Sequence, residues 1–154
     1  MLQVNWQCKF FDALTPSQLY DIIKLRNQVF VVEQNCVFQD ADDKDQQCYH
    51  LMGFVEGELA AYTRLVPAGV SYNYISIGRV VTASKYRNTG LGKALIMQSI
   101  DECFRLFGKQ TIKIGAQLYL KKFYEGFSFT QSSDMYLEDD IPHIEMLRLV
   151  EKEK

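Results

Sequence analysis

Residues 77 to 107 constrain the fold more than any other part of this chain. A β-branched run from Ile77 to Thr82 leads into a basic turn that contains Gly90 and Gly92, and apolar residues then recur at helical spacing. One stripe is formed by Leu91, Leu95, Ile96, Ser99, Ile100, Cys103, Phe104 and Phe107. Gly108 suits the end of a helix, because glycine readily adopts the conformation of a C-terminal cap. The sequence therefore predicts a strand, a glycine turn and a helix over 90–107.

The glycine turn has the properties of a phosphate-binding site. The first N–H groups of a helix have no partner within it, and the helix dipole adds partial positive charge there. Gly90 and Gly92 would let a phosphate approach the backbone, and Arg87 and Lys93 would add charge. The alternative is that the glycines serve only close packing at the start of the helix.

Two well-known glycine turns do not fit. A dinucleotide-binding turn needs a third glycine where this chain has Leu95. A Walker loop needs glycine at position 87 and serine or threonine after Lys93, but the chain has Arg87 and Ala94. The pattern that remains is Arg87-x-x-Gly90-x-Gly92.

Strand and helix signals alternate along the rest of the chain, which favours a mixed α/β or α+β fold. Thr15-Pro16-Ser17-Gln18 predicts the start of a helix, because threonine and glutamine can form a capping box, and this helix is expected to run to about Glu33. A short helix over Leu118–Glu125 is expected to stop at Gly126. Strands are expected at about 4–10, 48–55, 58–67, 74–82, 111–116, 127–137 and 143–150. The expected order is β-α-β-β-β-α-β-α-β-β.

Composition limits the class of protein. At 154 residues and 47% hydrophobic, the chain is expected to form one domain over 1–154. Seventeen basic residues against nineteen acidic ones argue against a general nucleic-acid binder. We find no signal peptide and no apolar run that could cross a membrane, so we expect a cytoplasmic protein without a membrane partner. The cysteines, at irregular spacing, are expected to be reduced thiols.

The glycine turn resembles the pyrophosphate-binding turn of the GNAT superfamily of acetyl-CoA-dependent N-acetyltransferases, whose pattern is Arg/Gln-x-x-Gly-x-Gly/Ala. The segment from Phe123 to Phe129 is similar to the Phe-Tyr-x-x-x-Gly-Phe segment of that superfamily. Its glycine, Gly126, stands earlier than in the pattern, so the turn that follows is expected to differ.

Three further segments resemble the ElaA-like branch of GNAT proteins. They are Val29-Phe30-Val31-Val32-Glu33-Gln34-x-Cys36, Ile77-Gly78-Arg79-Val80-Val81 and the run from Glu138 to Met146, in which Asp140 replaces an expected glycine. The resemblance covers nearly the whole chain. It implies a mostly antiparallel sheet flanked by helices, with central strands that splay apart.

The resemblance also implies a site for acetyl-CoA, used as the acetyl donor. The backbone of Val80, Val81 and Thr82 would pair with the pantetheine arm. Gln117 stands where many relatives have an asparagine that bonds this arm, and Phe123 would line the wedge between the strands. The pyrophosphate would be held by backbone groups of Arg87, Asn88, Thr89, Gly90, Leu91, Gly92 and Lys93.

For catalysis, Tyr124 matches the family tyrosine that serves as general acid for the CoA thiolate. With an ordinary pKa of about 10, its hydroxyl stays protonated at neutral pH. A backbone N–H near Val81 would stabilise the oxyanion. The alternative for Tyr124 is an ordinary core residue.

Glu33 is the candidate general base, since it ends the first helix and borders the loop expected over the acceptor. It could accept a proton directly or through water, or attract a cationic amine. The structural alternative is an ion pair with Arg26, Arg64 or Arg79.

Further candidates for the acceptor site come from the strands. His50 and His143 open two of them, and a histidine suits base chemistry at neutral pH, although each could equally be a hydrogen-bonded strand residue. Glu145 shares a strand face with His143.

Arg64 and Arg79 lie in apolar strand runs, nearly opposite each other. Buried arginines need acids, which Glu33 or Glu145 could supply. The pair either forms a structural ion cluster or recognises an anionic acceptor.

No metal is expected. The run from Asp40 to Asp45 begins like a calcium loop but lacks the required glycine and glutamate. Cys36, Cys48 and His50 match no known zinc spacing. Residues 35–47, with four aspartates, are expected to be a solvated surface loop or one that attracts an amine.

The leading hypothesis is direct transfer of an acetyl group from acetyl-CoA to a primary amine, which could belong to a small amine, a polyamine, an antibiotic or a protein lysine. The alternatives are a non-catalytic acyl-CoA-binding or sensing module and a protein-interaction domain on the same fold. Acceptor contacts are expected in loops 34–47, 66–74 and 130–142. A homodimer formed by strand pairing or C-terminal exchange is compatible with the sequence.

Overall fold

A single mixed sheet organises the computed structural model, which describes residues 2–150. The strands run in the order β1-β2-β3-β4-β5-β8-β6, and β7 also pairs with β8. Within the described residues β4 pairs with β5 in parallel, and the other pairs are antiparallel. The strands are β1 (Asn5–Phe10), β2 (Tyr49–Val55), β3 (Glu58–Val66), β4 (Ile75–Thr82), β5 (Ile112–Gln117), β6 (Thr130–Gln131), β7 (Tyr136–Glu138) and β8 (Ile141–Arg148).

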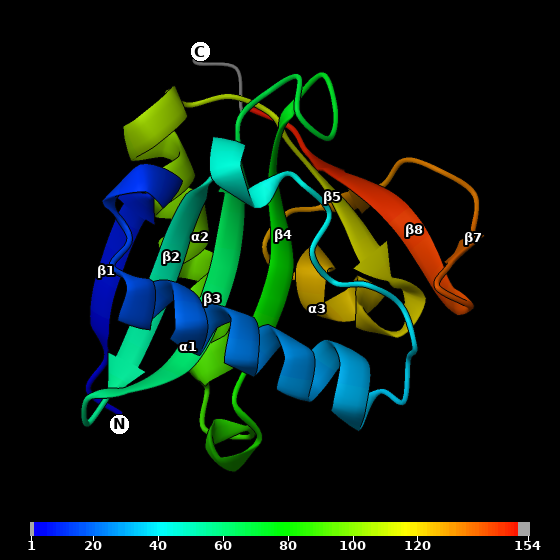
Figure 1. Cartoon of the computed structure of the whole chain (residues 1–154). Helices are drawn as coiled ribbons and strands as arrows, with labels where there is room; N and C mark the ends of the chain where they lie inside the picture. Colours follow the sequence, from blue (N-terminus) through cyan, green and yellow to red (C-terminus); the bar gives the residue numbers. More distant parts are fainter. Residues whose placement is uncertain (1, 151–154) are drawn as a thin grey trace.

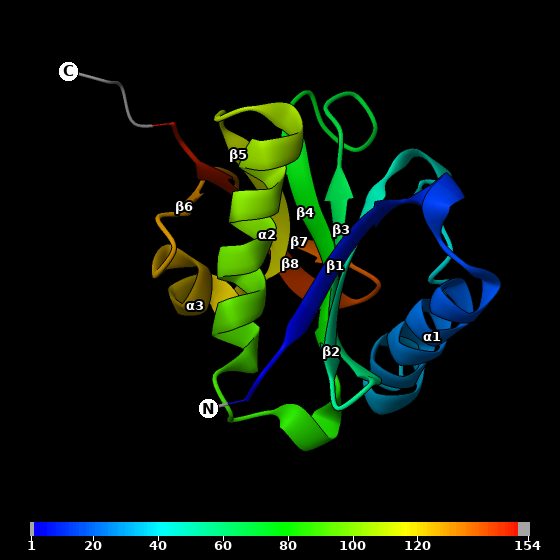
Figure 2. The same cartoon turned by 90° about the vertical axis from the view of Figure 1, so that its left-hand side faces the viewer.

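Helices cover both faces of the sheet. The α-helices are α1 (Pro16–Arg26), α2 (Leu91–Phe107) and α3 (Lys121–Glu125). Figures 1 and 2 show α1 on one face and α2 and α3 on the other. Two buried clusters follow from this arrangement. The larger joins the sheet to α2 and α3, and the smaller joins it to α1 through Ile22, Leu25 and Val29. The predicted fold class is confirmed, and no described helix is long and apolar enough to span a membrane.

The first helix begins as predicted but changes its hydrogen bonding before it ends. The capping box is present, with Gln18 N donating to Thr15 Oγ1 over 3.1 Å and Thr15 N donating to Gln18 Oε1 over 3.0 Å. From Asn27 to Glu33 the chain is a π-helix, in which Gln34 N donates to Val29 O five residues earlier. The buried face is formed by Ile22, Leu25, Arg26 and Val29. Ile23, which has helical spacing in the sequence, is 44% exposed.

The single strand expected over 127–137 is wrong. Two short strands, β6 and β7, pair with different parts of β8, so the sheet has one strand more than predicted. Between them the backbone loops outward, held by Ser132 N donating to Glu145 O over 2.9 Å. Glu145 N also donates to Ser133 Oγ over 2.9 Å. These polar contacts to β8 replace the regular ladder of a continuous strand.

Helix α3 ends at Glu125 with Gly126 as its C-cap, as predicted, but the left-handed residue of the cap is not this glycine. Gly126 has a right-handed φ of −61°, whereas Ser128 has a left-handed φ of +72°. Ser128 N donates to Glu125 O over 3.0 Å, and Phe129 N donates to Tyr124 O over 3.3 Å. This is a Schellman cap, with Ser128 in the position that glycine usually occupies. Ser128 and Phe129 therefore stand where the GNAT pattern has its glycine and second phenylalanine.

A bulge in β4 determines which side chains of this strand face the α2-side core and which face the α1-side core. Tyr62 lies opposite Val81 and Arg64 lies opposite Gly78, so two residues of β4 oppose one of β3. Arg79 in the bulge has a φ of +49°. In a regular strand Ile77 and Val81, four residues apart, would share a face, since side chains alternate. Instead Ile77 packs in the α2-side core and Val81 in the α1-side core.

The central strands splay, as the resemblance implies. Within the described residues β4 and β5 pair only through Ile75 with Ile112 and Ser76 with Lys113. Both strands start near the top of Figure 1 and separate toward the bottom, where α3 lies beside the gap. The rest of β4 keeps its partners on the β3 side, such as Ala61 opposite Thr82.

Candidate active site

The gap between β4 and β5 holds the predicted pantetheine contacts. Val80, Val81 and Thr82 lie on β4 beyond its last pair with β5, and Gln117 ends β5. A strand edge left without a partner carries free N–H and C=O groups that an extended amide chain can pair with. The fold thus brings these four residues to one opening.

The predicted pyrophosphate turn follows β4 directly. Residues Ser84–Tyr86 form a short 3₁₀ turn, and α2 begins at Leu91 after Gly90, whose φ is +84°. Asn88 is also left-handed, with a φ of +62°. Turns of this type direct successive N–H groups into an anion-binding concavity. The amide of Arg87 is occupied, because it donates to Ser84 O over 3.2 Å, so the free amides begin after it.

Side-chain contacts shape the turn from both sides. The Thr89 hydroxyl donates to Tyr86 O, which closes the turn on itself. Gly92 faces Phe123, since a Cβ built at Gly92 would lie 4.0 Å from Phe123 Cζ. The predicted wedge residue Phe123 and the start of α2 are therefore neighbours.

Glu33 pairs with a residue that we did not predict. Its Oε2 atom lies 2.6 Å from Arg87 Nη2, and its expected partners Arg26, Arg64 and Arg79 lie in another cluster. The two side chains are 37% and 40% exposed, so solvent screens the attraction. The candidate base and the charged residue of the phosphate turn are thus in direct contact.

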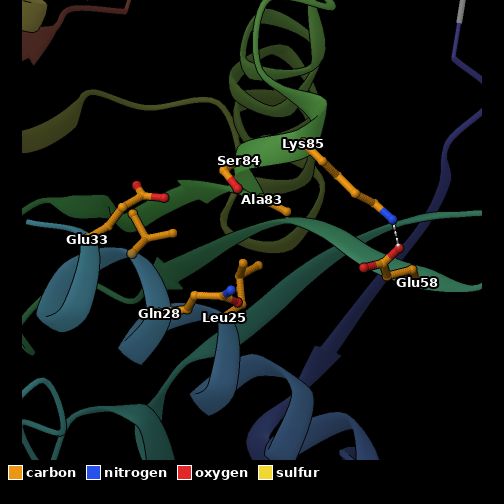
Figure 3. A pocket seen from close by; sticks show the side chains of 8 residues that line it. Leu25, Gln28, Glu33, Glu58, Ala83, Ser84 and Lys85 are labelled. Atoms are coloured by element: carbon orange, nitrogen blue, oxygen red, sulfur yellow. Dashed lines mark ion pairs between the residues drawn. The ribbon is translucent and has the colours of Figure 1, made fainter.

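A small hollow lies beside this ion pair. Its volume is about 100 Å³, far below the several hundred Å³ of a typical ligand pocket. In Figure 3, Glu33 stands at one end and the ion pair of Lys85 with Glu58 at the other. The hollow can take a small group or a few waters, whereas a long donor needs the open gap between β4 and β5. It is lined by Leu25, Gln28, Val29, Glu33, Glu58, Ala83, Ser84 and Lys85.

Tyr124 lies on α3 and is 6% exposed. Its ring makes edge contacts with Phe123 and Phe129, at centroid distances of 5.2 and 6.0 Å. Burial, helped by Tyr119, raises the pKa of the Tyr124 hydroxyl above its usual value. The group therefore stays protonated at neutral pH and can donate a proton. No hydrogen-bond partner of this hydroxyl is found among residues 2–150.

Arg64 and Arg79 belong to a closed ring of ion pairs. Of the two roles predicted for them, the structure therefore has the structural ion cluster. The acids are neither Glu33 nor Glu145 but three aspartates of the 35–47 loop, and Arg26 of α1 completes the ring. Contacts range from 2.7 to 3.3 Å. In order, the ring consists of Asp40, Arg26, Asp45, Arg64, Asp42 and Arg79.

The expectation of a solvated aspartate loop is therefore wrong, since three of its four aspartates pair with arginines of the sheet and α1. Burial alone would raise the pKa of Asp42, but the hydrogen bonds and charge of Arg64, with the charge of Arg79, hold it well below its usual range. Arg26 and Arg64 lower the pKa of Asp45 in the same way against the effect of burial. The three positive and three negative charges cancel, which leaves the ring neutral.

His50 is buried beside this ring. Its Nδ1 lies 2.7 Å from the Tyr62 hydroxyl and its Nε2 lies 2.9 Å from Asp45 O. Since a carbonyl only accepts, Nε2 donates to it and Nδ1 accepts from Tyr62 in the neutral imidazole. Burial lowers the pKa of His50. β3 separates His50 from β4 and the gap.

His143 and Glu145 lie on β8, on the far side of β5 from the gap. His143 Nδ1 is 2.7 Å from Ile141 O, and its Nε2 is 3.4 Å from Glu138 Oε2. Glu145 pairs with Lys113 at 3.0 Å. Tyr72 and Tyr136, which the sequence did not single out, stand over the same part of β5. Their convergence depends on Gly115 and on sheet register, which leave no local signal.

Of the three loops expected to bind the acceptor, loop 130–142 lies beside each of the other two. Cys36 Sγ of loop 34–47 lies 3.7 Å from Asp139 O of the β7–β8 turn. Tyr72 of loop 66–74 and Tyr136 of β7 both approach Gly115. Among residues 2–150, no group of three or more His, Cys, Asp or Glu side chains is arranged to hold a metal ion.

Comparison with known proteins agrees with this geometry. Residues 25–150 match the family model of the acetyltransferase (GNAT) domain. The chain is 36% identical over 149 residues to the protein ElaA of Escherichia coli, covering 96% of this chain and 97% of ElaA. It is 38% identical over 148 residues to a UPF0039 protein of Schizosaccharomyces pombe, covering 95% and 97%.

Solved structures show the same fold. An acyl-CoA N-acyltransferase of Pseudomonas aeruginosa superposes with a TM-score of 0.91 at 38% identity, covering 95% of this chain and 99% of the other. The crystal structure of Escherichia coli ElaA superposes with a TM-score of 0.89 at 35% identity, with the same coverage. The splayed sheet, the glycine turn and these matches together show that the chain belongs to the GNAT acyltransferase family.

Proposed function

We propose that this chain moves an acetyl group from acetyl-CoA to a primary amine by direct attack. The observation that carries the proposal is the gap between β4 and β5 beyond Ser76, followed by the glycine turn at the start of α2. A strand edge can pair with the amides of a pantetheine arm, and helix-start N–H groups can bind a pyrophosphate. The two features are continuous in the chain, since β4 leads through the turn into α2.

The donor would be held mostly by backbone groups. Val80, Val81 and Thr82 offer the edge of β4, and the amides that follow Arg87 offer the anion site. Gln117 would bond the arm from the β5 side, and Phe123 would pack against it. Binding through backbone groups would let a chain with a net charge of −2 bind an anion. The positive ends of the peptide dipoles would supply the local positive charge.

In the reaction, the neutral amine nitrogen forms a bond to the thioester carbonyl carbon and the carbon–sulfur bond breaks. A backbone N–H near Val81 would stabilise the oxyanion that develops. Tyr124 would donate its proton to the leaving thiolate and regain one from solvent. The surplus proton of the attacking nitrogen would pass to Glu33, directly or through water. No cysteine is required as an acyl carrier.

Substitution of Tyr124 tests the role of general acid. Tyr124→Phe keeps the ring and its packing but removes the proton donor, so kcat should fall by about a hundredfold with the acetyl-CoA dissociation constant unchanged. The measurements are CoA thiol release with a panel of amines and calorimetric titration of acetyl-CoA. Tyr20→Phe, at a 70% exposed position on α1, is the matched control. Unchanged turnover in the Tyr124 variant would show that Tyr124 is not the general acid.

One observation favours the second candidate, a non-catalytic acyl-CoA-binding module. One oxygen of the Glu33 carboxylate is paired with Arg87, and a carboxylate held in this ion pair would not take up the proton of the amine. This candidate predicts acetyl-CoA binding by calorimetry with no CoA release in the presence of any amine. Absence of acetyl-CoA binding at millimolar concentration would overturn both candidates.

We further propose one domain over residues 1–154 that acts in the cytoplasm. The four cysteines are free thiols, two of them buried, as expected of a reducing compartment. The homodimer remains a prediction, which sedimentation would test.

A further inference from the structure

One face of the sheet over β5 and β8 has polar side chains and no helix above it. On β5, Ile112, Ile114 and Ala116 pack in the α2-side core, so Lys113, Gly115 and Gln117 face the other way. On β8 the same alternation places His143 and Glu145 on that face, opposite Gln117 and Gly115. Helix α1 packs on β3 and β4. In Figure 1, β5 and β8 lie to the right of these two strands.

Two tyrosine hydroxyls converge at the centre of this face. A Cβ built on Gly115 would lie 3.0 Å from the hydroxyl oxygen of Tyr72 and 3.1 Å from that of Tyr136. A side chain at this position would push the two hydroxyls back by a few tenths of an ångström. Among residues 2–150 neither hydroxyl has a hydrogen-bond partner. Two hydroxyl groups directed at one point and left without partners are available to a ligand.

The same face already holds an alkylammonium group. Lys113 Nζ lies 4.9 Å from the centre of the Tyr72 ring and 3.0 Å from Glu145 Oε2. An aromatic face and a carboxylate are the two groups that bind an ammonium ion most readily. Lys113 therefore shows which kind of ligand group this surface accommodates.

The charges around the two hydroxyls favour a cation. Glu145 and Glu138 carry two negative charges against one positive charge on Lys113, and His143, stacked on Tyr136, contacts Glu138. Burial, Tyr72 and the two glutamates raise the pKa of Tyr136 to about 12. The hydroxyl is therefore neutral at physiological pH and can accept a hydrogen bond from an ammonium group.

The position of the face beside the gap gives this cation a function. Gly115 and Gln117 belong to the part of β5 that has separated from β4, so a molecule over Gly115 lies next to the proposed donor site. The attacking nitrogen must be neutral, whereas carboxylate, hydroxyl and aromatic groups favour a charged ammonium. The group bound over Gly115 is therefore not the attacking group.

We propose that the acceptor is a small di- or polyamine whose second, protonated amino group is anchored over Gly115 by the Tyr72 and Tyr136 hydroxyls and Glu145. This inference rests on the proposed acetyl transfer and names its substrate class. The neutral amino group at the other end of the acceptor reaches the donor in the gap between β4 and β5.

The test compares 1,4-diaminobutane with butylamine as acceptors in CoA thiol release. The diamine should have a kcat/KM at least tenfold higher, because only it presents a second ammonium. Tyr72→Phe and Tyr136→Phe should each reduce this preference, and the double variant should abolish it, since a hydrogen bond to a charged group is worth about tenfold or more. The acetyl-CoA dissociation constant should not change.

Two further variants separate anchoring from folding. Gly115→Ala adds one methyl group where the hydroxyls converge, and should lower the diamine preference without removing a polar group. Tyr20→Phe on α1 should leave it intact. Equal use of diamine and monoamine, or a preference that survives in the double tyrosine variant, would overturn the proposal.

Calorimetric titration of 1,4-diaminobutane distinguishes this proposal from the acetyl transfer itself. Binding that the tyrosine substitutions weaken supports the anchor even if no transfer occurs. Normal acetyl-CoA binding and turnover of other amines, without diamine binding, would leave the acetyltransferase intact and overturn the substrate class.

Discussion

Several single residues other than glycine adopt a left-handed backbone conformation, which side chains with a Cβ disfavour. Ser128, in the turn that follows α3, has a φ of +72°, and Asp139 and Asp140 form the β7–β8 turn with φ of +51° and +62°. A residue with a Cβ costs about 1–2 kcal/mol in this conformation relative to its ordinary one. The cap at Ser128 is maintained by two backbone hydrogen bonds and the contact of Phe129 with Tyr124.

Ser128→Gly should therefore stabilise the protein. Relief of the left-handed Cβ outweighs the extra entropy of glycine in the unfolded chain, for a gain of about 1 kcal/mol. Urea unfolding measures the change. The control is Ser132→Gly, at an exposed position with an ordinary φ, which should lose a few tenths of a kcal/mol. A loss of stability in both variants would contradict the Schellman cap described above.

At the scale of elements, the ion-pair ring joins loop 35–47 to α1, β3 and β4. Arg79 lies in the β4 bulge, and its ion pairs therefore fix the bulge in place. The bulge directs Val80 toward the α2-side core and Val81 toward the α1-side core. The aspartates of the ring are 14 to 39 residues from the arginines they contact. Loop, helix and bulge are therefore expected to lose order together.

Asp42→Asn tests this coupling. The substitution removes one of the two carboxylates that pair with the buried Arg64 and leaves only that of Asp45. It should lower the free energy of unfolding in urea by about 2–3 kcal/mol. Asp43→Asn removes the same charge from an exposed neighbour outside the ring, and should change stability by less than about 0.5 kcal/mol. Equal effects of the two substitutions would mean that the ring contributes no more than surface charge.

The contact of Glu33 with Arg87 couples the first helix to the phosphate turn. Glu33→Gln should release Arg87 toward the proposed pyrophosphate and strengthen acetyl-CoA binding about two- to fivefold, the range of an exposed ion pair. Arg87→Ala should weaken binding. Calorimetry measures both, with Glu56→Gln at an exposed turn as the control. If Glu33→Gln weakened binding, Glu33 would contribute to the donor site and would not compete for Arg87.

At the scale of the whole molecule, buried ionisable groups determine how stability depends on pH. The pKa of His50 is lowered by burial, so the unfolded state binds more protons as pH falls below about 6.5 and the folded state loses stability. The pKa values of Asp42 and Asp45 are also lowered, overall, by their arginines. Their contribution is complete above about pH 4 and is lost as pH falls further.

Unfolding free energy should accordingly decline in two steps on acidification, first from about pH 6.5 and then from about pH 4. Urea titrations at several pH values measure the profile. His50→Gln should flatten the first step, and Asp42→Asn should reduce the second. A profile that is flat between pH 7 and pH 5 in the native sequence would show that His50 is protonated without cost to the fold.

Features whose causes are local could be predicted from the amino-acid sequence. The capping box at Thr15 and the strand–turn–helix around Gly90 depend on residues within one or two turns of each other. Their side chains and backbone preferences are sufficient to specify them. Local patterns also carried the family resemblance and the position of the phosphate turn.

Contacts between residues far apart in the chain depend on the tertiary fold. Glu33 reaches Arg87 across 54 positions, and the hydroxyls of Tyr72 and Tyr136 meet over Gly115. The ring partners, the Arg79 bulge and the break between β6 and β7 depend likewise on strand register. One residue of register exchanges the two faces of a strand, so these contacts follow from how the whole sheet closes and not from any short run of residues.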